Sequence, residues 1–188
     1  FVLLLASTRE GEEALLLDAL AGLELPGLLL VLVPRHPQRF EEVARLLAAR
    51  GLAYARRSEQ RAPQADTRVF LGDSMGELAA YYAAADLAYV GGSLLPLGGQ
   101  NMIEAAAAGC PALFGPHTWN FMEAAERAVA RGAARRVADA EELATAVAVL
   151  YRDPVARERM REAGLQFAAA NRGATARIMT MLERASPR

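Results

Sequence analysis

Residues 87–104 read Leu-Ala-Tyr-Val-Gly-Gly-Ser-Leu-Leu-Pro-Leu-Gly-Gly-Gln-Asn-Met-Ile-Glu. The first four form a short apolar run that is typical of a buried strand. Residues 91–99 contain four glycines and a proline and are expected to form a loop. A helix is expected over 101–108, and Gly109 ends it. A strand, a loop and a helix in this order are typical of a parallel α/β sheet.

The rest of the chain repeats this alternation of short apolar runs and helical patterns. The predicted strands cover residues 1–6, 28–33, 52–56, 68–71, 87–90, 111–114 and 133–137. The predicted helices cover residues 10–21, 37–50, 75–84, 101–108, 119–131, 140–151, 154–171 and 174–184. Right-handed crossovers then predict an α/β fold, a Rossmann-like doubly wound parallel sheet with helices on both faces. Ligands of such sheets bind at the carboxyl ends of the strands, at the topological switch point.

The composition bounds the class of protein. A chain of 188 residues with 53% apolar residues is long and apolar enough for a folded domain, which excludes disorder. The single cysteine, Cys110, excludes a disulfide framework and is expected to be a small buried thiol. The net charge of −1 lacks the basic excess that is typical of nucleic-acid-binding proteins, so we predict no nucleic-acid partner. Two histidines and one cysteine argue against a zinc site, and we predict no metal.

The ends of the chain also carry expectations. The sequence starts without Met inside an apolar run, so we expect a domain of a longer protein. No basic segment precedes that run, so a signal peptide is not predicted. No apolar stretch reaches the roughly 18 residues that a membrane span needs.

Polar residues follow the first two strands. Ser7 or Thr8 is placed to cap the next helix, whose first turn is acidic; alternatively, this polar loop faces a ligand. After the second strand, prolines on both sides hold the loop that carries Arg35. Its guanidinium there either forks onto a phosphate or carboxylate, or pairs with Glu41 or Glu42.

The segment after the fourth predicted strand combines a cap with an open backbone. Asp73 or Ser74 is expected to cap the helix over 75–84. Met75, Gly76 and Glu77 would then present free N–H groups, and Gly76 leaves room for a flat ring such as a nucleobase.

The glycine-rich loop is the strongest candidate for binding an anion. Residues from Gly99 to Met102 lie at the start of the helix predicted over 101–108. Their backbone N–H groups are free to bind an anion, and the helix dipole favours negative charge there. Glu104, one turn later, is placed to accept hydrogen bonds from ribose hydroxyls, or else only favours the helix start. His117 has no Ser-His-Asp or metal spacing around it. No G-x-G-x-x-G follows the first strand, which disfavours an NAD-dependent enzyme.

These segments together resemble the C-terminal half of the 3-deoxy-D-manno-octulosonic acid (Kdo) transferases, from about Ser7 to Gly173. The segments that carry the resemblance are Ser7-Thr8-Arg9-Glu10-Gly11-Glu12-Glu13, Pro34-Arg35-His36-Pro37, Gly72-Asp73-Ser74-Met75-Gly76-Glu77, Gly91-Gly92-Ser93, Gly98-Gly99-Gln100-Asn101 with Glu104, and Phe114-Gly115-Pro116-His117-Thr118. One departure is Ala105, where many relatives have proline.

The resemblance implies the C-terminal half of a GT-B glycosyltransferase, an inverting and metal-independent enzyme without a cofactor beyond its substrate nucleotide. The donor would be CMP-Kdo and the acceptor a lipid A precursor, in lipopolysaccharide core biosynthesis at the cytoplasmic face of the bacterial inner membrane. Residues 1–188 would be one nucleotide-sugar-binding domain with C-terminal helices from about 154. The family's N-terminal domain, with the general base and the membrane-associating acceptor region, would be absent. We therefore expect this chain to bind CMP weakly and to transfer nothing alone.

The resemblance also implies roles for individual residues. Pro34 and Arg35 would approach the phosphate, Met75, Gly76 and Glu77 would line the cytosine pocket, and Asn101, Met102, Ile103 and Glu104 would hold phosphate and ribose. The residues expected to line the cleft are Ser7, Thr8, Gly92, Ser93, Gly99, Gln100 and His117. Two alternatives stay open: a GT-B transferase or epimerase that uses a UDP-sugar, and a non-catalytic nucleotide-binding module.

Overall fold

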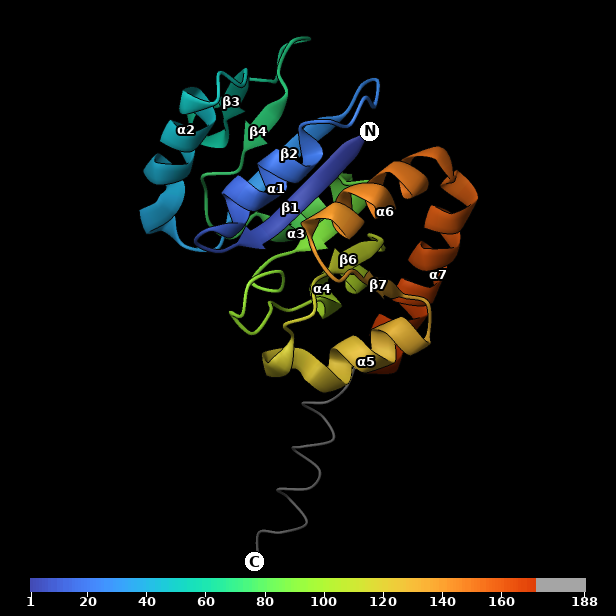
Figure 1. Ribbon diagram of the computed structural model, residues 1–188. Coiled ribbons are helices and arrows are strands. Elements are labelled where there is room, and N and C mark those ends of the chain that lie inside the picture. The colour runs from blue at the N-terminus through green and yellow to red at the C-terminus, as the bar shows by residue number, and fades with distance from the viewer. Residues whose placement is uncertain (172–188) are drawn as a thin grey trace, which may run out of the picture.

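The computed structural model describes residues 1–171 and contains one seven-stranded sheet (Figure 1). The strands are β1 (Val2–Thr8), β2 (Leu29–Pro34), β3 (Tyr54–Arg56), β4 (Val69–Leu71), β5 (Leu87–Val90), β6 (Ala112–Phe114) and β7 (Ala134–Arg136). Their order is β3-β4-β2-β1-β5-β6-β7, and every pair is parallel. The predicted Rossmann-like doubly wound sheet is confirmed.

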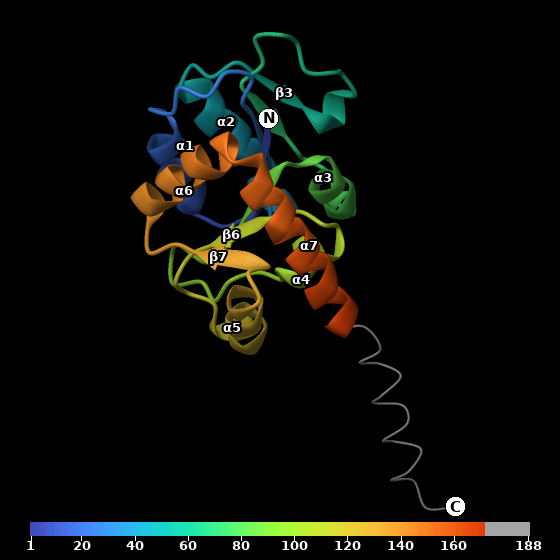
Figure 2. The same cartoon turned by 90° about the vertical axis from the view of Figure 1, so that its right-hand side faces the viewer.

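Helices cover both faces of this sheet (Figure 2). They are α1 (Glu12–Leu20), α2 (Phe40–Ala49), α3 (Leu78–Ala84), α4 (Ile103–Ala107), α5 (Met122–Ala130), α6 (Ala140–Arg152) and α7 (Pro154–Asn171). Single 3-10 turns lie at Pro37–Arg39, Arg57–Glu59 and Trp119–Phe121. Helices α1, α2 and α6 pack on one face, and α3, α4, α5 and α7 pack on the other. Within residues 1–171, no helix combines the length and apolar character that crossing a membrane needs.

The central strand shows why the apolar runs predicted the sheet correctly. Leu3 and Leu5 of β1 pack towards α1 and α6, and Leu4 and Ala6 pack towards α3 and α4. All four side chains are fully buried, because a parallel strand between two helix layers has no solvent face. Burial of each leucine contributes about 2 kcal/mol relative to exposure.

The strand order reverses next to β1, which pairs with β2 on one side and with β5 on the other. The chain therefore builds the sheet outward from β1 in both directions, and the loops that follow β1 and β5 diverge at the carboxyl edge of the sheet. A crevice outside the carboxyl ends of β1, β2 and β5 is the usual ligand site of such a sheet.

Helix starts differ most from the sequence-based expectation. The helix predicted over 37–50 is a 3-10 turn followed by α2, and the one predicted over 75–84 begins only at Leu78. The expected cap by Asp73 or Ser74 is wrong, because residues 74–77 form a turn with Gly76 at φ +82°. The helix predicted over 174–184 lies outside the described residues.

Candidate nucleotide-binding site

A pocket of about 310 Å³ lies at the carboxyl ends of β1, β2, β4 and β5. The predicted site residues that line it are Ser7, Pro34, Arg35, Met75, Gly76, Gln100, Asn101 and Glu104. They come from four segments that are far apart in the sequence, and Phe121, the last residue of the 3-10 turn before α5, also lines the pocket. The fold thus brings together half of the residues predicted from separate strand ends.

Arg35 is exposed at the end of β2, and its backbone N–H donates to the Thr8 carbonyl at 2.9 Å. Its Nε donates to Gln100 Oε1 at 3.2 Å. The alternative pairing with Glu41 or Glu42 is not formed, because Glu41 bonds Arg56 and Glu42 bonds Arg39. The Arg35 guanidinium therefore keeps donor groups for a ligand in the pocket.

Ser7 lies at an irregular point of β1, where the register with β2 shifts between Ala6 and Thr8. Its φ of +53° is in the left-handed region, which non-glycine residues adopt rarely. Such bulges re-aim the chain near functional sites. The neighbouring Gly91 permits this geometry, because a Cβ there would lie only 2.5 Å from the Ser7 carbonyl oxygen.

The turn of residues 74–77 is held from outside the pocket. Glu77 accepts hydrogen bonds from Ser74 Oγ and Arg57, and it does not line the pocket. Asp73 accepts from Ser58 N and Oγ and from Arg56 Nε at 2.6–2.8 Å. Burial raises the pKa of Asp73, but these hydrogen bonds outweigh burial and hold the pKa below its ordinary value. The ionised carboxylate thus fixes the turn that presents Met75 and Gly76.

The start of α4 is built by Asn101, whose Oδ1 accepts the Ile103 N–H at 3.1 Å. Its Nδ2 donates to Glu104 Oε1 at 3.0 Å, which holds that exposed carboxylate at the pocket rim. Met102 is buried in the core, and neither it nor Ile103 lines the pocket. The Gly99 N–H donates to the Gly92 carbonyl, so it is not the free anion donor that the sequence predicted.

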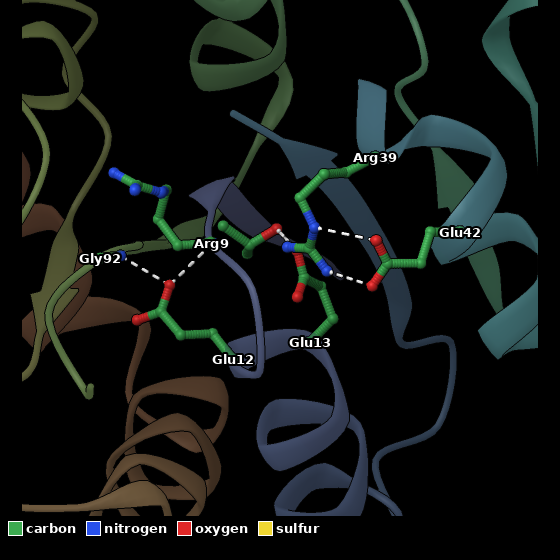
Figure 3. Close-up of polar contacts among 7 residues, drawn as sticks. Arg9, Glu12, Glu13, Arg39, Glu42 and Gly92 are labelled. Atoms are coloured by element: carbon green, nitrogen blue, oxygen red, sulfur yellow. Dashed lines mark hydrogen bonds and ion pairs between the residues drawn. The ribbon is translucent and has the colours of Figure 1, made fainter. Parts of the chain in front are cut away.

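Glu12 is the residue that sequence reasoning missed. It is fully buried and accepts five hydrogen bonds (Figure 3 shows those from Arg9 and Gly92). The donors are Arg9 N at 2.9 Å, Tyr89 Oη at 2.6 Å, Gly92 N at 2.6 Å, Ser93 N at 3.0 Å and Leu94 N at 3.2 Å. The carboxylate thereby ties the glycine-rich loop to the start of α1.

Three residues predicted to line the cleft, Thr8, Gly92 and Ser93, bond within the protein instead and do not line the pocket. The Gly92 and Ser93 amides bond Glu12, and the Ser93 side chain is buried with its hydroxyl on the Val90 carbonyl at 2.6 Å. Thr8 is fully buried and donates to Glu13 Oε1 at 2.8 Å. The expected cap by Ser7 or Thr8 is also wrong, because the residue before α1 is Gly11, at φ +84°.

Glu13, next to this network, is also buried and pairs with Arg39 at 2.7 Å. Burial raises the pKa of Glu13, and the hydrogen bonds from Arg39 and Thr8 offset only part of that effect. Arg39 also bonds Glu42, so its charge is matched by two carboxylates (Figure 3).

His117 and Gly99 pack against each other beside the loop and do not line the pocket. The His117 backbone N–H donates to the Ser93 carbonyl at 3.0 Å. Cys110 is buried as predicted, and burial raises the pKa of its thiol to about 12. Within residues 1–171, no group of three or more His, Cys, Asp or Glu side chains is arranged to hold a metal ion.

Comparison with known proteins decides the family. Residues 15–167 match the model of the group 1 glycosyl transferases. The chain belongs to this family. The matched range includes the segments of this chain that line the pocket after β2, β4 and β5, whereas Ser7 and Glu12 precede it.

Individual relatives within this family are more informative. The chain is 50% identical over 190 residues to a 3-deoxy-D-manno-octulosonic acid transferase of Bordetella pertussis, covering 97% of this chain and 44% of that protein. A Haemophilus influenzae protein of the same name is 41% identical, with 95% and 42% covered. The chain thus spans less than half the length of these relatives.

A solved structure agrees with these relatives. The C-terminal CMP-Kdo binding domain of WaaA from Acinetobacter baumannii superimposes with a TM-score of 0.84 and 34% identity, covering 88% of each chain. The resemblance to the C-terminal domain of Kdo transferases is confirmed.

Proposed function

We propose that this chain is the donor-binding domain of a glycosyltransferase that transfers Kdo from CMP-Kdo to a lipid A precursor. The observation that carries the proposal is the pocket at the switch point, with the Arg35 guanidinium at its rim. Its support is the similarity to a solved domain described as CMP-Kdo binding.

The donor is assigned to the pocket by chemistry. Arg35 and Pro34 would receive the phosphate, since a guanidinium forks onto phosphate oxygens. Met75 and Gly76 would contact cytosine; Gly76 is exposed, and a Cβ there would meet no atom within 4 Å, so a planar ring has access. Glu104 would accept from the ribose hydroxyls in the position in which Asn101 holds it. Glu77, Met102 and Ile103 would contribute indirectly, because their backbone helps to position the neighbouring pocket residues Gly76, Asn101 and Glu104.

The chain's own contribution to transfer is to bind and orient the donor and to stabilise charge on the leaving phosphate. Within residues 1–171, Glu104 is the carboxylate that lines the pocket, and its bond to Asn101 suits ribose binding. Because Glu104 is used for ribose binding, we assign the general base and the lipid acceptor to a separate acceptor domain. We also propose that transfer proceeds by inversion and without a metal or cofactor. The acceptor's nature places the reaction at the cytoplasmic face of the inner membrane in this proposal.

Titration with nucleotides tests the donor assignment. The chain is expected to bind CMP more tightly than UMP, and NAD not at all, as measured by calorimetry or by chemical-shift changes near Arg35, Met75 and Asn101. A preference for UMP would instead favour a UDP-sugar-using GT-B enzyme. Absence of binding to all three nucleotides would contradict the proposal for this chain.

Two substitutions test the site itself. Arg35→Ala and Glu104→Ala are each expected to weaken CMP binding about tenfold or more, because hydrogen bonds to charged groups contribute ~1.5–3 kcal/mol. Arg45→Ala is the matched control, since Arg45 is an exposed arginine of α2 that does not line the pocket. Affinities measured by calorimetry that stay unchanged in both site variants would refute the assignment.

A further inference from the structure

Arg9 and Arg35 stand at the ends of neighbouring strands. Arg9 directly follows β1, and Arg35 directly follows β2. The Arg35 N–H donates to the carbonyl of Thr8, the residue before Arg9, at 2.9 Å. Paired parallel strands lie about 4.8 Å apart, so the two arginine side chains start from neighbouring backbone positions at the same edge of the sheet.

The two arginines also approach the same side chain of the glycine-rich loop. A Cβ placed on Gly92 would lie 3.3 Å from Gln100 Nε2 and 3.5 Å from Arg9 Cγ, so these two side chains converge over Gly92. Gln100 Oε1 accepts from Arg35 Nε at 3.2 Å. Arg9 and Arg35 therefore flank Gln100, which lines the pocket.

Neither guanidinium has a carboxylate partner within residues 1–171. Figure 3 shows the Arg9 side chain directed away from the carboxylates of Glu12 and Glu13, while Arg39 is held between Glu13 and Glu42. His36 lies close to both arginines. Its pKa is lowered, first by partial desolvation and then by the positive charges of Arg9, Arg35 and Arg39. Arg35 lines the pocket, and Arg9 lies just outside its lining on the other side of Gln100, so two cations are available to a ligand that extends beyond the pocket.

We propose that Arg9 binds the carboxylate of the donor's sugar acid, while Arg35 binds its phosphate. This inference rests on the proposed CMP-Kdo donor. In a CMP-linked 2-ulosonic acid, the phosphate oxygen and the carboxylate are attached to the same anomeric carbon. The two anions are therefore neighbours, as the two arginine side chains that flank Gln100 are, and both anions suit the planar fork of arginine. Arg9 would distinguish sugar-acid donors from neutral hexose donors.

A nucleoside diphosphate also presents two adjacent anions, so the test includes UDP. Affinities for CMP, CMP-Kdo and UDP are measured by calorimetry for the natural chain, Arg9→Ala, Arg9→Lys and Arg35→Ala. Arg9→Ala is expected to weaken CMP-Kdo binding about tenfold or more and to change CMP binding less than about twofold. Arg9→Lys, which keeps the charge without the fork, is expected to lie between the natural chain and Arg9→Ala. Arg35→Ala is expected to weaken both ligands.

The outcomes separate this inference from the proposed function. Equal weakening of CMP and CMP-Kdo by Arg9→Ala, or unchanged CMP-Kdo affinity, would overturn the role of Arg9 while the donor assignment stands. A natural chain that binds UDP in preference to both CMP ligands would overturn both. Thermal unfolding of each variant shows whether the fold is kept. If Arg9→Ala fails to fold, Arg9→Lys is used in its place, and a loss of CMP-Kdo affinity larger than its loss of CMP affinity supports the role of Arg9.

Discussion

Replacing Glu12 by alanine is expected to lower the free energy of unfolding by about 3–5 kcal/mol. Its buried carboxylate accepts the backbone N–H groups of Gly92, Ser93 and Leu94 and the Tyr89 hydroxyl. Alanine leaves these donors buried without an acceptor, and each unsatisfied buried donor costs about 1–3 kcal/mol. Partial access of water to the new space keeps the expected total below the sum of these costs.

Urea unfolding at equilibrium measures this effect through the midpoint at constant slope. Glu10→Ala is the matched control, because Glu10 is an exposed carboxylate two residues earlier and is expected to change stability by less than about 0.5 kcal/mol. Glu12→Gln is expected to fall between the two, since its amide keeps one acceptor oxygen but turns an NH₂ group towards N–H donors. Equal midpoints for Glu12→Ala and Glu10→Ala would contradict the anchoring role.

The position of Glu12 explains what the glycine-rich loop does. Three successive backbone N–H groups that point to one side form a typical anion-binding concavity. Here the anion is the protein's own carboxylate, which fixes the loop from inside. The loop then serves the pocket through its far end, where Gly99 donates to the Gly92 carbonyl and Gln100 bonds Arg35.

The strands and the sheet were predictable from the sequence for a local reason. A strand buried on both faces is an unbroken apolar run, as in residues 28–33 and 87–90, and the alternation with helices leaves few topologies. The position of Arg35 was predictable in the same way, because a residue after a strand must lie at the carboxyl edge.

The roles of Glu12 and Thr8 were not predictable. The partners of Glu12 are distant in the sequence, and for Thr8 a buried partner competes with the helix start for the same hydroxyl. Glu12 bonds residues about 80 positions later, and the sequence-based reading of an acidic first turn fits its place equally well. Thr8 was a plausible cap, but its hydroxyl donates to Glu13 inside the core. The late start of α3 follows from the tertiary contacts of Asp73 with Ser58 and of Glu77 with Arg57, which hold residues 74–77 as a turn.

Replacing Gly115 by alanine is expected to lower the free energy of unfolding by about 3 kcal/mol and to weaken CMP binding. Gly115 follows β6, and a Cβ there would lie 2.6 Å from Leu94 N and closer still to the Ser93 carbonyl oxygen. Both atoms belong to the backbone that Glu12 holds, so the clash cannot be relieved by a side-chain rotation.

The displacement should pass along the loop to the pocket. Gly115 N also donates to Ser93 Oγ at 2.9 Å, so moving β6 away from Ser93 weakens that hydrogen bond, and moving Ser93 disturbs the Glu12 network. Gly22→Ala is the matched control, because a Cβ there meets no atom within 4 Å and its φ is outside the left-handed region. It is expected to be neutral or to stabilise by up to ~1 kcal/mol. If urea unfolding gave both variants the same midpoint, the contact between β6 and the loop would not be a rigid one, and the loop would owe its position to Glu12 and not to β6.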